Sequence, residues 1–374
     1  MKFLINKEDL YNGIKLVGNV AAIRSVQPVL YNILIETNGS NSIKLTATDL
    51  ELTISTIIDA KVDEEGKITL PSKKLNDLVS RLSDSLVSFE MEDNNNQVKI
   101  TCDNSKFEII GISASEFPNM FENLSEDEDK FTEIEMKPFV KSIKEASYAA
   151  ANFETNNLLS GVVCNINDNI LEMASTDGNR LARVREKIST PDNKNNQMII
   201  PSKTTNEFLK MSTLINDSAL KICNDKSKLI LKTEKTILVS NLMEGQYPKY
   251  NQLIPDKNPK TAIINKSKLL SALERVSVMV NEKTSIVKFE FSENKLTLKA
   301  DTPESGASEE SFEIEYKSED MLIAFNYKYV SEALKNMECE NVQINLNTNL
   351  SATIFRPDSE EDYISLIMPV QIRD

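Results

Sequence analysis

The stretch KITLPSKKLNDLVSRL, from Lys67 to Leu82, joins a short strand pattern directly to a helical pattern. Its first residues alternate between polar and apolar side chains, as expected for a half-buried β-strand. Further on, Leu75, Leu78 and Val79 recur with Leu82 at positions i, i+3, i+4 and i+7, which predicts a helix with one buried face. The stretch therefore predicts a strand that leads without a loop into a helix packed on a sheet.

The same strand-to-helix pattern occurs six times along the chain. The other copies are KFLINKEDLYNGIKLV, TEIEMKPFVKSIKEAS, QMIIPSKTTNEFLKMS, TAIINKSKLLSALERV and MLIAFNYKYVSEALKN. The predicted helices begin at Lys7, Ser72, Lys137, Ser202, Lys266 and Asn326, so successive starts are 65, 65, 65, 64 and 60 residues apart. This regular spacing indicates an internal repeat. Because further strand patterns follow each helix, the repeats predict an α+β protein with mostly antiparallel sheets.

The six units are expected to pair into three similar domains. The related segments LTATDLEL, MASTDGNR and LKADTPES occur only in odd-numbered units, and their aspartates Asp49, Asp177 and Asp301 are 128 and 124 residues apart. This distance is close to two units, so each domain is expected to contain two of them. The predicted domains are an N-terminal domain of residues 1–130, a central domain of residues 131–254 and a C-terminal domain of residues 255–374.

The composition excludes several classes of enzyme. No histidine is present among the 374 residues, which rules out a Ser-His-Asp triad and a zinc site with histidine ligands. A Walker loop and a G-x-G-x-x-G motif are also missing, and the four cysteines are far apart. We therefore expect no catalytic residues, no metal site and no cofactor. With no long apolar run and no signal-peptide pattern, we also expect no membrane partner and a cytoplasmic location.

The predicted helices share one positively charged face. Each helix has a Lys or Arg within its first three positions and another at offsets seven to nine, although the chain has 43 Lys and Arg against 57 Asp and Glu. Residues seven positions apart lie on the same helix face. A face that only meets solvent would carry mixed charges, so equivalent cations in six helices favour a common polyanion, contacted without base readout. These cations include Lys73, Lys74, Arg81, Lys137, Lys144, Lys203, Lys210, Lys268, Arg275, Lys328 and Lys335.

Taken together, the repeat, the three domains and the basic helix face resemble the bacterial sliding clamp family, the beta subunit of DNA polymerase III. The segments that carry the resemblance are, in order, LTATDLEL, SASEFPNM, MASTDGNRLA, EGQYPKYNQLIP, VNEKT, FNYKYVSEAL and YISLIMPVQIRD. The resemblance implies a DNA-clamp fold with sheets outside and helices lining a central channel. It also implies a non-catalytic, head-to-tail homodimeric ring that encircles double-stranded DNA and tethers the replicative polymerase.

The resemblance further implies a hydrophobic pocket between the central and C-terminal domains. In the family this pocket takes a linear motif from the DNA polymerase III alpha subunit, the clamp loader, other polymerases and repair proteins. Aliphatic, Met and Pro side chains suit such a role because they adapt to different apolar partners. The matching positions are Leu159, Thr176, Gly178, Asn179, Arg180, Leu181, Pro248, Leu253, Thr284, Asn326, Tyr329, Leu366, Ile367, Met368, Pro369 and Val370.

Some positions depart from the family pattern. Thr284 stands where the family often has an aromatic residue, and Asn251 and Gln252 stand where many members have basic residues. The sequence therefore does not determine which linear motif the predicted pocket prefers.

The DNA and dimer contacts are also carried over from the resemblance. Arg24, in the loop after the first helix, matches a family DNA contact. The dimer interface is expected to place Phe107 and Ile109 of one subunit against Val278 and Met279 of the other.

Two other functions are compatible with parts of the sequence. In a nucleotide- or nucleic-acid-processing enzyme, Asp49, Asp177 and Asp301 could be metal ligands, but three symmetric copies should lie far apart. A turn role for Asp177 is therefore favoured. A scaffold that does not bind DNA would tolerate charge reversal on the helices, whereas a DNA-dependent protein would not.

Overall fold

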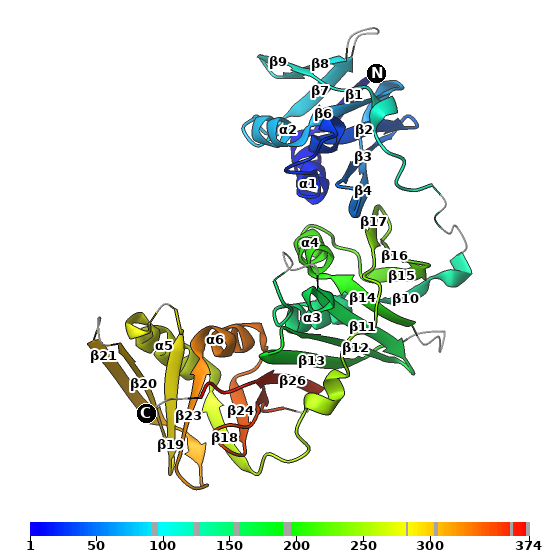
Figure 1. Ribbon diagram of the computed structural model, residues 1–374. Helices are drawn as coiled ribbons and strands as arrows, with labels where there is room; N and C mark the ends of the chain where they lie inside the picture. Colours follow the sequence, from blue (N-terminus) through cyan, green and yellow to red (C-terminus); the bar gives the residue numbers. More distant parts are fainter. Residues whose placement is uncertain are drawn as a thin grey trace. The chain divides into compact units, whose positions relative to one another are not determined.

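The computed structural model describes residues 1–91, 96–122, 124, 128–152, 157–189, 196–281, 283–302, 306–359 and 362–371. The chain forms two compact units (Figure 1). Unit 1 combines Met1–Lys137 with Ser189–Asp192 and Lys203–Leu242. Unit 2 combines Pro138–Ile188 with Asn193–Ser202 and Met243–Asp374. The residues of the predicted central domain are therefore shared between the two units, while the predicted domain boundaries remain predictions.

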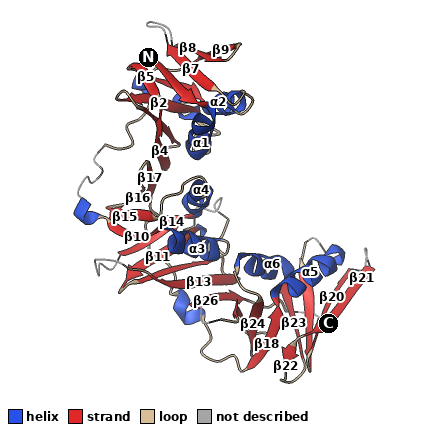
Figure 2. Ribbon diagram, turned by 180° about the vertical axis from the view of Figure 1, so that it is seen from behind, coloured by secondary structure: helices blue, strands red, loops and turns tan. Residues whose placement is uncertain are grey.

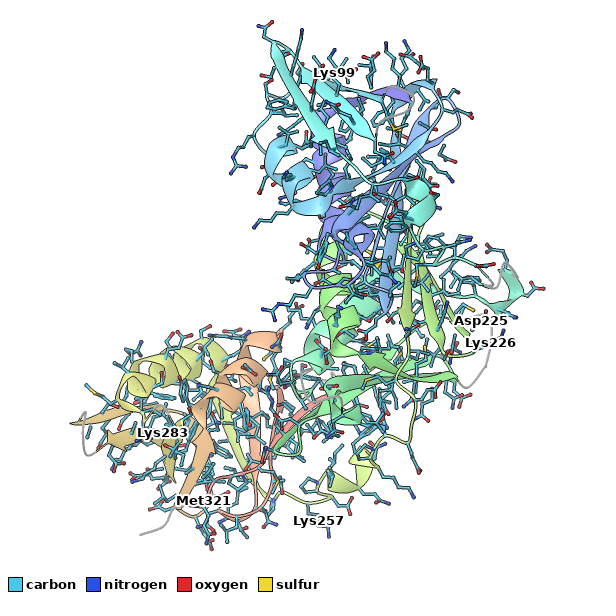
Figure 3. The ribbon with its side chains drawn as sticks, turned by 45° about the horizontal axis from the view of Figure 1, so that its top comes forward. Lys99, Asp225, Lys226, Lys257, Lys283 and Met321 are labelled. Carbon is cyan, nitrogen blue, oxygen red and sulfur yellow. The ribbon has the colours of Figure 1, made fainter. Side chains whose placement is uncertain are left out.

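Unit 1 contains a large sheet and a small sheet. The strand order of the large sheet is β10 (Thr132–Glu135), β15 (Ala219–Asp225), β16 (Lys228–Lys232), β17 (Thr236–Asn241), β4 (Leu52–Asp59), β3 (Ser42–Thr48), β2 (Asn32–Asn38) and β6 (Lys67–Pro71). The order of the small sheet is β5 (Lys61–Glu64), β1 (Lys2–Asn6), β7 (Leu86–Met91), β8 (Gln97–Cys102) and β9 (Ser105–Ile110). The turn between β15 and β16 contains Lys226, whose φ is 61° (Figure 3).

The helices of unit 1 are α1 (Lys7–Gly18), α2 (Ser72–Val79) and all but the first residue of α4 (Ser202–Ser212). Helix α1 approaches the large sheet closely at Gly13, where an added Cβ would lie 3.0 Å from Leu45 Cδ1 and 3.1 Å from Ile58 Cδ1. A larger residue there would force the helix away from the sheet.

Unit 2 repeats this plan with different strands (Figure 2). The order of its large sheet is β14 (Asn196–Pro201), β11 (Gly161–Asn167), β12 (Ile170–Thr176), β13 (Arg180–Lys187), β26 (Asp362–Ile367), β25 (Thr353–Pro357), β24 (Asn341–Leu346), β18 (Lys260–Asn265) and β22 (Glu315–Tyr316). The order of its small sheet is β21 (Gly306–Glu313), β20 (Lys295–Thr302), β19 (Ile286–Ser292) and β23 (Met321–Asn326). Its helices are α5 (Lys266–Val276), α6 (Tyr327–Asn336) and most of α3 (Met136–Ser147).

Asparagine explains why several helices start directly after a strand. Strands β1, β18 and β23 end at Asn6, Asn265 and Asn326. The side chains of these asparagines accept hydrogen bonds from the backbone N–H groups of Glu8, Lys268 and Lys328, respectively. An asparagine at this position satisfies a donor that the first helical turn leaves unpaired. The strand-to-helix transition is therefore encoded locally.

In each large sheet, a strand from one repeat pairs with a strand from another repeat, and the register of this pairing is the same in both sheets. In unit 1, Leu52 of β4 lies opposite Ser240 of β17, and in unit 2, Arg180 of β13 lies opposite Ile367 of β26. Leu52 and Arg180 each stand three residues after an equivalent aspartate, Asp49 or Asp177. We call these two junctions the β4–β17 joint and the β13–β26 joint.

The predicted α+β class with antiparallel sheets is confirmed, and the described helices begin within one residue of the predicted starts. Helix α3 begins at Met136 rather than Lys137, and α6 begins at Tyr327 because Asn326 is its cap. The prediction that the second helix extends to Leu82 was wrong. Helix α2 ends at Val79, because the Ser80 hydroxyl and the Arg81 guanidinium both donate hydrogen bonds to the carbonyl of Asp77. No described helix is both long enough and apolar enough to cross a membrane.

Candidate partner-binding and DNA-facing sites

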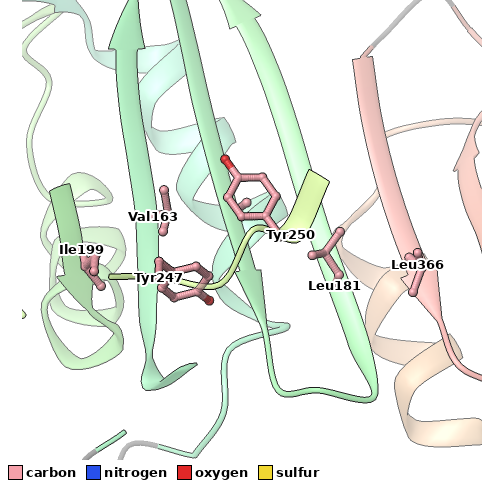
Figure 4. Close-up of a cluster of buried hydrophobic side chains, with 7 residues drawn as sticks. Val163, Leu181, Ile199, Tyr247, Tyr250 and Leu366 are labelled. Carbon is pink, nitrogen blue, oxygen red and sulfur yellow. The ribbon is translucent and has the colours of Figure 1, made fainter. Parts of the chain in front are cut away.

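At the β13–β26 joint, apolar side chains from distant segments meet in one buried cluster (Figure 4). Leu181 of β13 and Leu366 of β26 lie opposite each other in the sheet. Ser175 on β12 donates a hydrogen bond to the carbonyl of Ala146 in α3, so Thr176, its neighbour, points to the face away from α3. We call the following set the apolar cluster: Val163, Ala174, Leu181, Ile199, Tyr247, Tyr250 and Leu366, with half-buried Leu158, Leu159, Met243, Ile254 and Ala352 packed beside it.

A tight turn between β12 and β13 borders the apolar cluster. Asp177 Oδ1 accepts hydrogen bonds from the backbone N–H groups of Asn179 (2.8 Å) and Arg180 (3.1 Å). The Thr176 hydroxyl donates to the carbonyl of Arg180 at 2.6 Å, and the Gly178 N–H donates to that hydroxyl oxygen at 3.1 Å. Gly178 has a φ of +92°, which residues with a Cβ rarely adopt. Asp177 therefore holds the turn, as predicted.

The Arg180 side chain links this turn to helix α6. Its Nε lies 3.0 Å from Asp177 Oδ2, and its Nη1 forms a short ion pair with Glu332 of α6. Its guanidinium carbon also lies 4.6 Å from the ring centroid of Tyr329. Burial, together with the charge of Asp177, raises the pKa of the Tyr329 hydroxyl. Tyr329 therefore stays neutral near neutral pH and can donate a hydrogen bond.

The segment after β26 forms an exposed rim beside the turn. The Met368 N–H donates to the carbonyl of Asn179 at 2.9 Å, and the Val370 N–H donates to the carbonyl of Ala324 at 2.8 Å. These bonds fix the backbone while the Met368 side chain stays 40% exposed. Leu253, in the short 3-10 helix Tyr250–Leu253, is 53% exposed. The rim thus offers apolar side chains to a partner next to a preformed apolar floor.

Two tyrosines that sequence reasoning missed are central to the apolar cluster. The Tyr247 hydroxyl accepts a hydrogen bond from the Thr176 N–H at 3.1 Å, and burial raises its pKa to about 12. The Tyr250 hydroxyl donates a short hydrogen bond to Glu172. Burial acts to raise the pKa of Glu172, but the hydrogen bonds from Tyr250 and Arg185 outweigh it and lower the pKa. The quoted segment EGQYPKYNQLIP contained the available signal, two tyrosines that flank a Pro-Lys pair.

The structure brings most of the predicted pocket residues together, but not all of them. Leu181 and Leu366 are buried in the apolar cluster and form a floor rather than an exposed surface, whereas buried Ile367 follows Leu366 on β26 and points to the opposite face of the sheet. Asn326 caps helix α6. Thr284 is exposed and is not one of the residues of the apolar cluster. Exposed Pro248 accepts a hydrogen bond from the Tyr250 N–H at 2.8 Å, which tightens the segment that carries both tyrosines.

The predicted DNA-facing cations fall into two groups. Several pair with carboxylates: Lys144 with Glu338 (2.8 Å), Lys203 with Asp49, Lys210 with Glu207 (2.7 Å), Arg275 with Glu310 (2.5 Å) and Lys335 with Glu274 (3.1 Å). A second group has no carboxylate partner among the described residues: Arg24, Lys73, Lys74, Lys137, Lys268 and Lys328. Arg81 lies beyond the end of α2, where its guanidinium donates to the carbonyl of Asp77 at 2.6 Å. The positive face is therefore partly neutralised by neighbouring acids, which sequence counting did not reveal.

Arg24 lies in a loop that the protein holds in place. The Tyr31 hydroxyl donates to the carbonyl of Ser25 and accepts from its N–H, both at 2.7 Å. Beside this loop, a groove of about 760 Å³ in unit 1 is lined by residues of α1, α2 and α4, including Lys15, Lys73 and Lys210. Glu207 also lines this groove and pairs with Lys210, which leaves Lys15 and Lys73 as the ammonium groups able to meet an extended phosphate backbone.

Three domain models of one family match this chain in order. The N-terminal, central and C-terminal domains of the DNA polymerase III beta subunit match residues 1–121, 133–249 and 251–371. The beta sliding clamps of Synechococcus elongatus and Synechocystis are each 31% identical to this chain, with both chains covered in full. The chain belongs to the DNA polymerase III beta subunit family, the beta sliding clamps.

Solved clamp structures agree with the fold. The beta subunit of Pseudomonas aeruginosa bound to griselimycin superposes with a TM-score of 0.91 at 26% identity, with both chains covered in full. The Bacillus subtilis sliding clamp also gives a TM-score of 0.91 over both full chains, and at 23% identity it supports the fold alone. The three-domain clamp fold predicted from the sequence is thereby confirmed. As a member of this family the chain is a processivity subunit for DNA replication and not an enzyme.

Each of the three repeated aspartates, Asp49, Asp177 and Asp301, has a structural role in its own part of the fold. Asp49 Oδ1 accepts from the N–H groups of Glu51 (3.1 Å) and Leu52 (2.9 Å), as Asp177 does in its own turn. Asp301 instead pairs with Lys288 at 2.9 Å. Two copies are turn residues and the third forms an ion pair, so each has a structural partner.

Two of the residues predicted at the clamp dimer interface, Phe107 and Ile109, lie on β9, and the other two, Val278 and Met279, lie in the 3-10 helix Ser277–Met279. Strand β9 is an edge strand of unit 1, and β21 is an edge strand of unit 2. Ile109 is buried within its own sheet, whereas its neighbour Ile110 is 77% exposed. Val278 is 75% exposed. On β9 the most exposed apolar side chain is thus that of Ile110, and the four predicted interface contacts stay predictions.

Proposed function

We propose that two copies of this chain join head to tail into a ring that slides on duplex DNA, and that the apolar cluster with its exposed rim docks the replicative polymerase. Beta sliding clamps act as rings, so the DNA stays threaded through the closed ring even when the affinity of the protein for DNA is low. Weak attraction suits sliding, since tight phosphate contacts would slow it. The observation that carries the proposal is the rim of Met368 and Leu253 beside a buried floor that includes Leu181 and Leu366.

Docking at this rim would use a peptide of mixed character. The exposed thioether of Met368 and the isobutyl group of Leu253 would pack on apolar side chains of the motif. Arg180 and Tyr329 would then fix the direction of the peptide through polar contacts. Related pocket-lining positions are Leu159, Thr176, Gly178, Asn179, Pro248, Pro369 and Val370.

The free edges of β9 and β21 support a head-to-tail dimer. An unpaired strand edge exposes a row of N–H and C=O groups that a second strand can pair with. Strand β9 carries one Lys and one Glu, Lys106 and Glu108, beside its exposed Ile110. Pairing of β9 with β21 would bury Ile110 and would bring it toward Val278 of the 3-10 helix Ser277–Met279, which packs near β21.

The dimer is tested by sedimentation of three variants. Ile110→Asp and Val278→Asp should each shift the protein toward monomer at micromolar concentration, because each places a charge in an apolar contact. Ile23→Asp is the matched control, since Ile23 is a strongly exposed apolar residue of a loop. If both interface variants remain dimeric, the edge-to-edge arrangement is wrong.

Loader-dependent DNA synthesis tests the function as a whole. On primed circular DNA, the wild-type chain should lengthen the products of its polymerase, and Met368→Ala with Leu253→Ala should abolish the gain while the dimer persists. Unchanged product length with the wild type would contradict the proposal. Because the partners act on the bacterial chromosome, we also propose a cytoplasmic location.

A further inference from the structure

The β4–β17 joint of unit 1 contains an apolar cavity of its own. The cavity has a volume of about 440 Å³, and Phe121, Phe131, Ile230 and Ile237 form most of its apolar lining. Ile230 is buried, while the other three are half-buried. A volume of this size falls within the range of sites that bind small ligands or peptide side chains, roughly 300 to 1,000 Å³.

The cavity lies on the face of the large sheet away from the helices. Leu45 of β3 contacts α1 near Gly13, so Lys44, its neighbour, points to the opposite face. Ser240 of β17 hydrogen-bonds to Thr204 of α4, so Ile237 likewise points away from that helix. The cavity is therefore separated by the sheet from the helix face that carries the cations described above.

The β4–β17 joint is built like the joint that carries the apolar cluster. Phe121, at the end of the segment FPNMF (Phe117–Phe121), packs on the first joint, as Tyr247 and Tyr250 of the segment YPKY (Tyr247–Tyr250) pack on the second. In each segment a proline follows one aromatic residue and precedes another. The paired strands also share their register, since Thr53 faces Val239 as Leu181 faces Leu366. One construction thus forms two apolar sites, one in each unit.

One equivalent position carries opposite charges in the two sites. Lys44 stands five residues before Asp49, and Glu172 stands five residues before Asp177, so the two occupy the same place in the repeat. Lys44 Nζ lies 4.8 Å from the Phe121 ring centroid, and no carboxylate pairs with it in the described parts of the chain. Lys232 Nζ lies 5.8 Å from the Phe131 ring centroid.

One carboxylate at the rim is shared by two lysines. Glu128 accepts hydrogen bonds from Lys221 (2.7 Å) and Lys232 (2.8 Å), which lower its pKa to about 2. The cavity lining itself contains two lysines, Lys44 and Lys232, and one carboxylate, Glu128, in a chain whose net charge is −14. The cavity is a local positive site on an acidic protein.

We propose that this cavity is a second docking site, and that it binds an acidic peptide segment of a partner protein with one aromatic or large aliphatic anchor. The anchor fills the apolar cavity between Phe121 and Phe131. An adjacent Asp or Glu of the peptide pairs with Lys44. Binding here is independent of the apolar cluster, so a partner can occupy either site alone.

Capped tripeptides test the site directly. The probe is acetyl-Asp-Phe-Asp amide, and acetyl-Asn-Phe-Asn amide is its uncharged counterpart; binding to the full chain is followed by saturation-transfer NMR. The charged probe should bind more tightly than the neutral one. Lys44→Glu should weaken the charged probe by about fivefold, because an attractive ion pair becomes a repulsive contact. All titrations are repeated in the Met368→Ala background, which should give the same result.

Two further variants complete the test. Lys99→Glu on β8 makes the same charge change at an exposed lysine of the small sheet and should leave probe binding unchanged (Figure 3). Ile237→Trp fills the cavity and should abolish binding of both probes, with folding checked by thermal denaturation. Equal binding of the two probes, or wild-type affinity in Lys44→Glu, overturns the proposal. So does displacement of the charged probe by a single-stranded oligonucleotide, which would assign the lysines to nucleic acid.

Discussion

The guanidinium carbon of Arg180 lies 4.6 Å from the ring centroid of Tyr329, and through this contact strand β13 is tied to helix α6. The same guanidinium pairs with Asp177 in the turn and with Glu332 on the helix. Three partners thus converge on one side chain, which fixes the turn beside the rim that carries Met368.

Arg180→Ala should lower both stability and partner binding. The change leaves Asp177, which is mostly buried, without its ionic partner, and we expect a loss of about 2 kcal/mol in the free energy of unfolding. Denaturant titration measures the stability, and anisotropy of a labelled polymerase-derived peptide measures the binding. Arg356→Ala is the control, because Arg356 is exposed and, among the described residues, donates to Gln343 of the neighbouring strand in the same sheet. Equal behaviour of the two variants would show that the contacts of Arg180 are unimportant.

Met368→Ala and Leu253→Ala should weaken peptide binding without destabilising the fold. Met368 is 40% and Leu253 is 53% exposed in the free protein, so truncation removes apolar area that would become buried in the complex. We expect about tenfold weaker binding for each, measured by calorimetry, with unfolding unchanged. Leu350→Ala, at another exposed leucine of unit 2, should change neither peptide binding nor stability. By contrast, Leu181→Ala should cost about 2 to 5 kcal/mol of stability, because Leu181 is buried core.

Cations without a carboxylate partner should contribute more to the salt dependence of DNA binding than paired ones. A free ammonium group releases about one counterion on binding phosphate, so Lys74→Ala should reduce the slope of log affinity against log salt by about one. Lys335 already pairs with Glu274 at 3.1 Å, so Lys335→Ala should reduce the slope less. Titration of a short duplex at several salt concentrations distinguishes the two. A larger effect for Lys335→Ala would contradict this ranking.

Glu128 should make the stability of unit 1 depend on pH in the acid range. Hydrogen bonds from Lys221 and Lys232 lower its pKa from 4.5 to about 2 in the folded protein. A depressed carboxyl pKa stabilises the fold above pH 4.5, and this stabilisation is lost as the pH falls toward 2. Glu128→Gln should therefore reduce the melting temperature near neutral pH and differ less from the wild type at low pH. Glu116→Gln, at an exposed carboxylate, is the control and should show no such convergence.

Particular residues show where prediction from the sequence succeeded and where it failed. The helix starts were predicted to within one residue, because asparagine caps and apolar periodicity are local signals. Arg81 was placed wrongly on a helix, since the bonds to the Asp77 carbonyl that accompany the end of α2 do not appear in the periodicity. Tyr247 and Tyr250 were missed because a tyrosine after a strand gives no sign that its hydroxyl will meet Thr176 or Glu172 across the fold.

The sequence by itself determined the repeat, the antiparallel α+β class and the position of each helix, because these depend on side-chain spacing over a few turns or strands. Only the tertiary structure decided which charges meet and which apolar surfaces remain open. Lys144 and Glu338 are 194 residues apart in the chain, and Arg180 and Glu332 are 152 apart. Such pairs arise when strand registers such as that of β13 with β26 are set, and no local pattern encodes the partner across that distance. The same registers place Phe121 and Tyr250 over equivalent joints, where Lys44 has no carboxylate partner among the described residues while Glu172 pairs with Arg185.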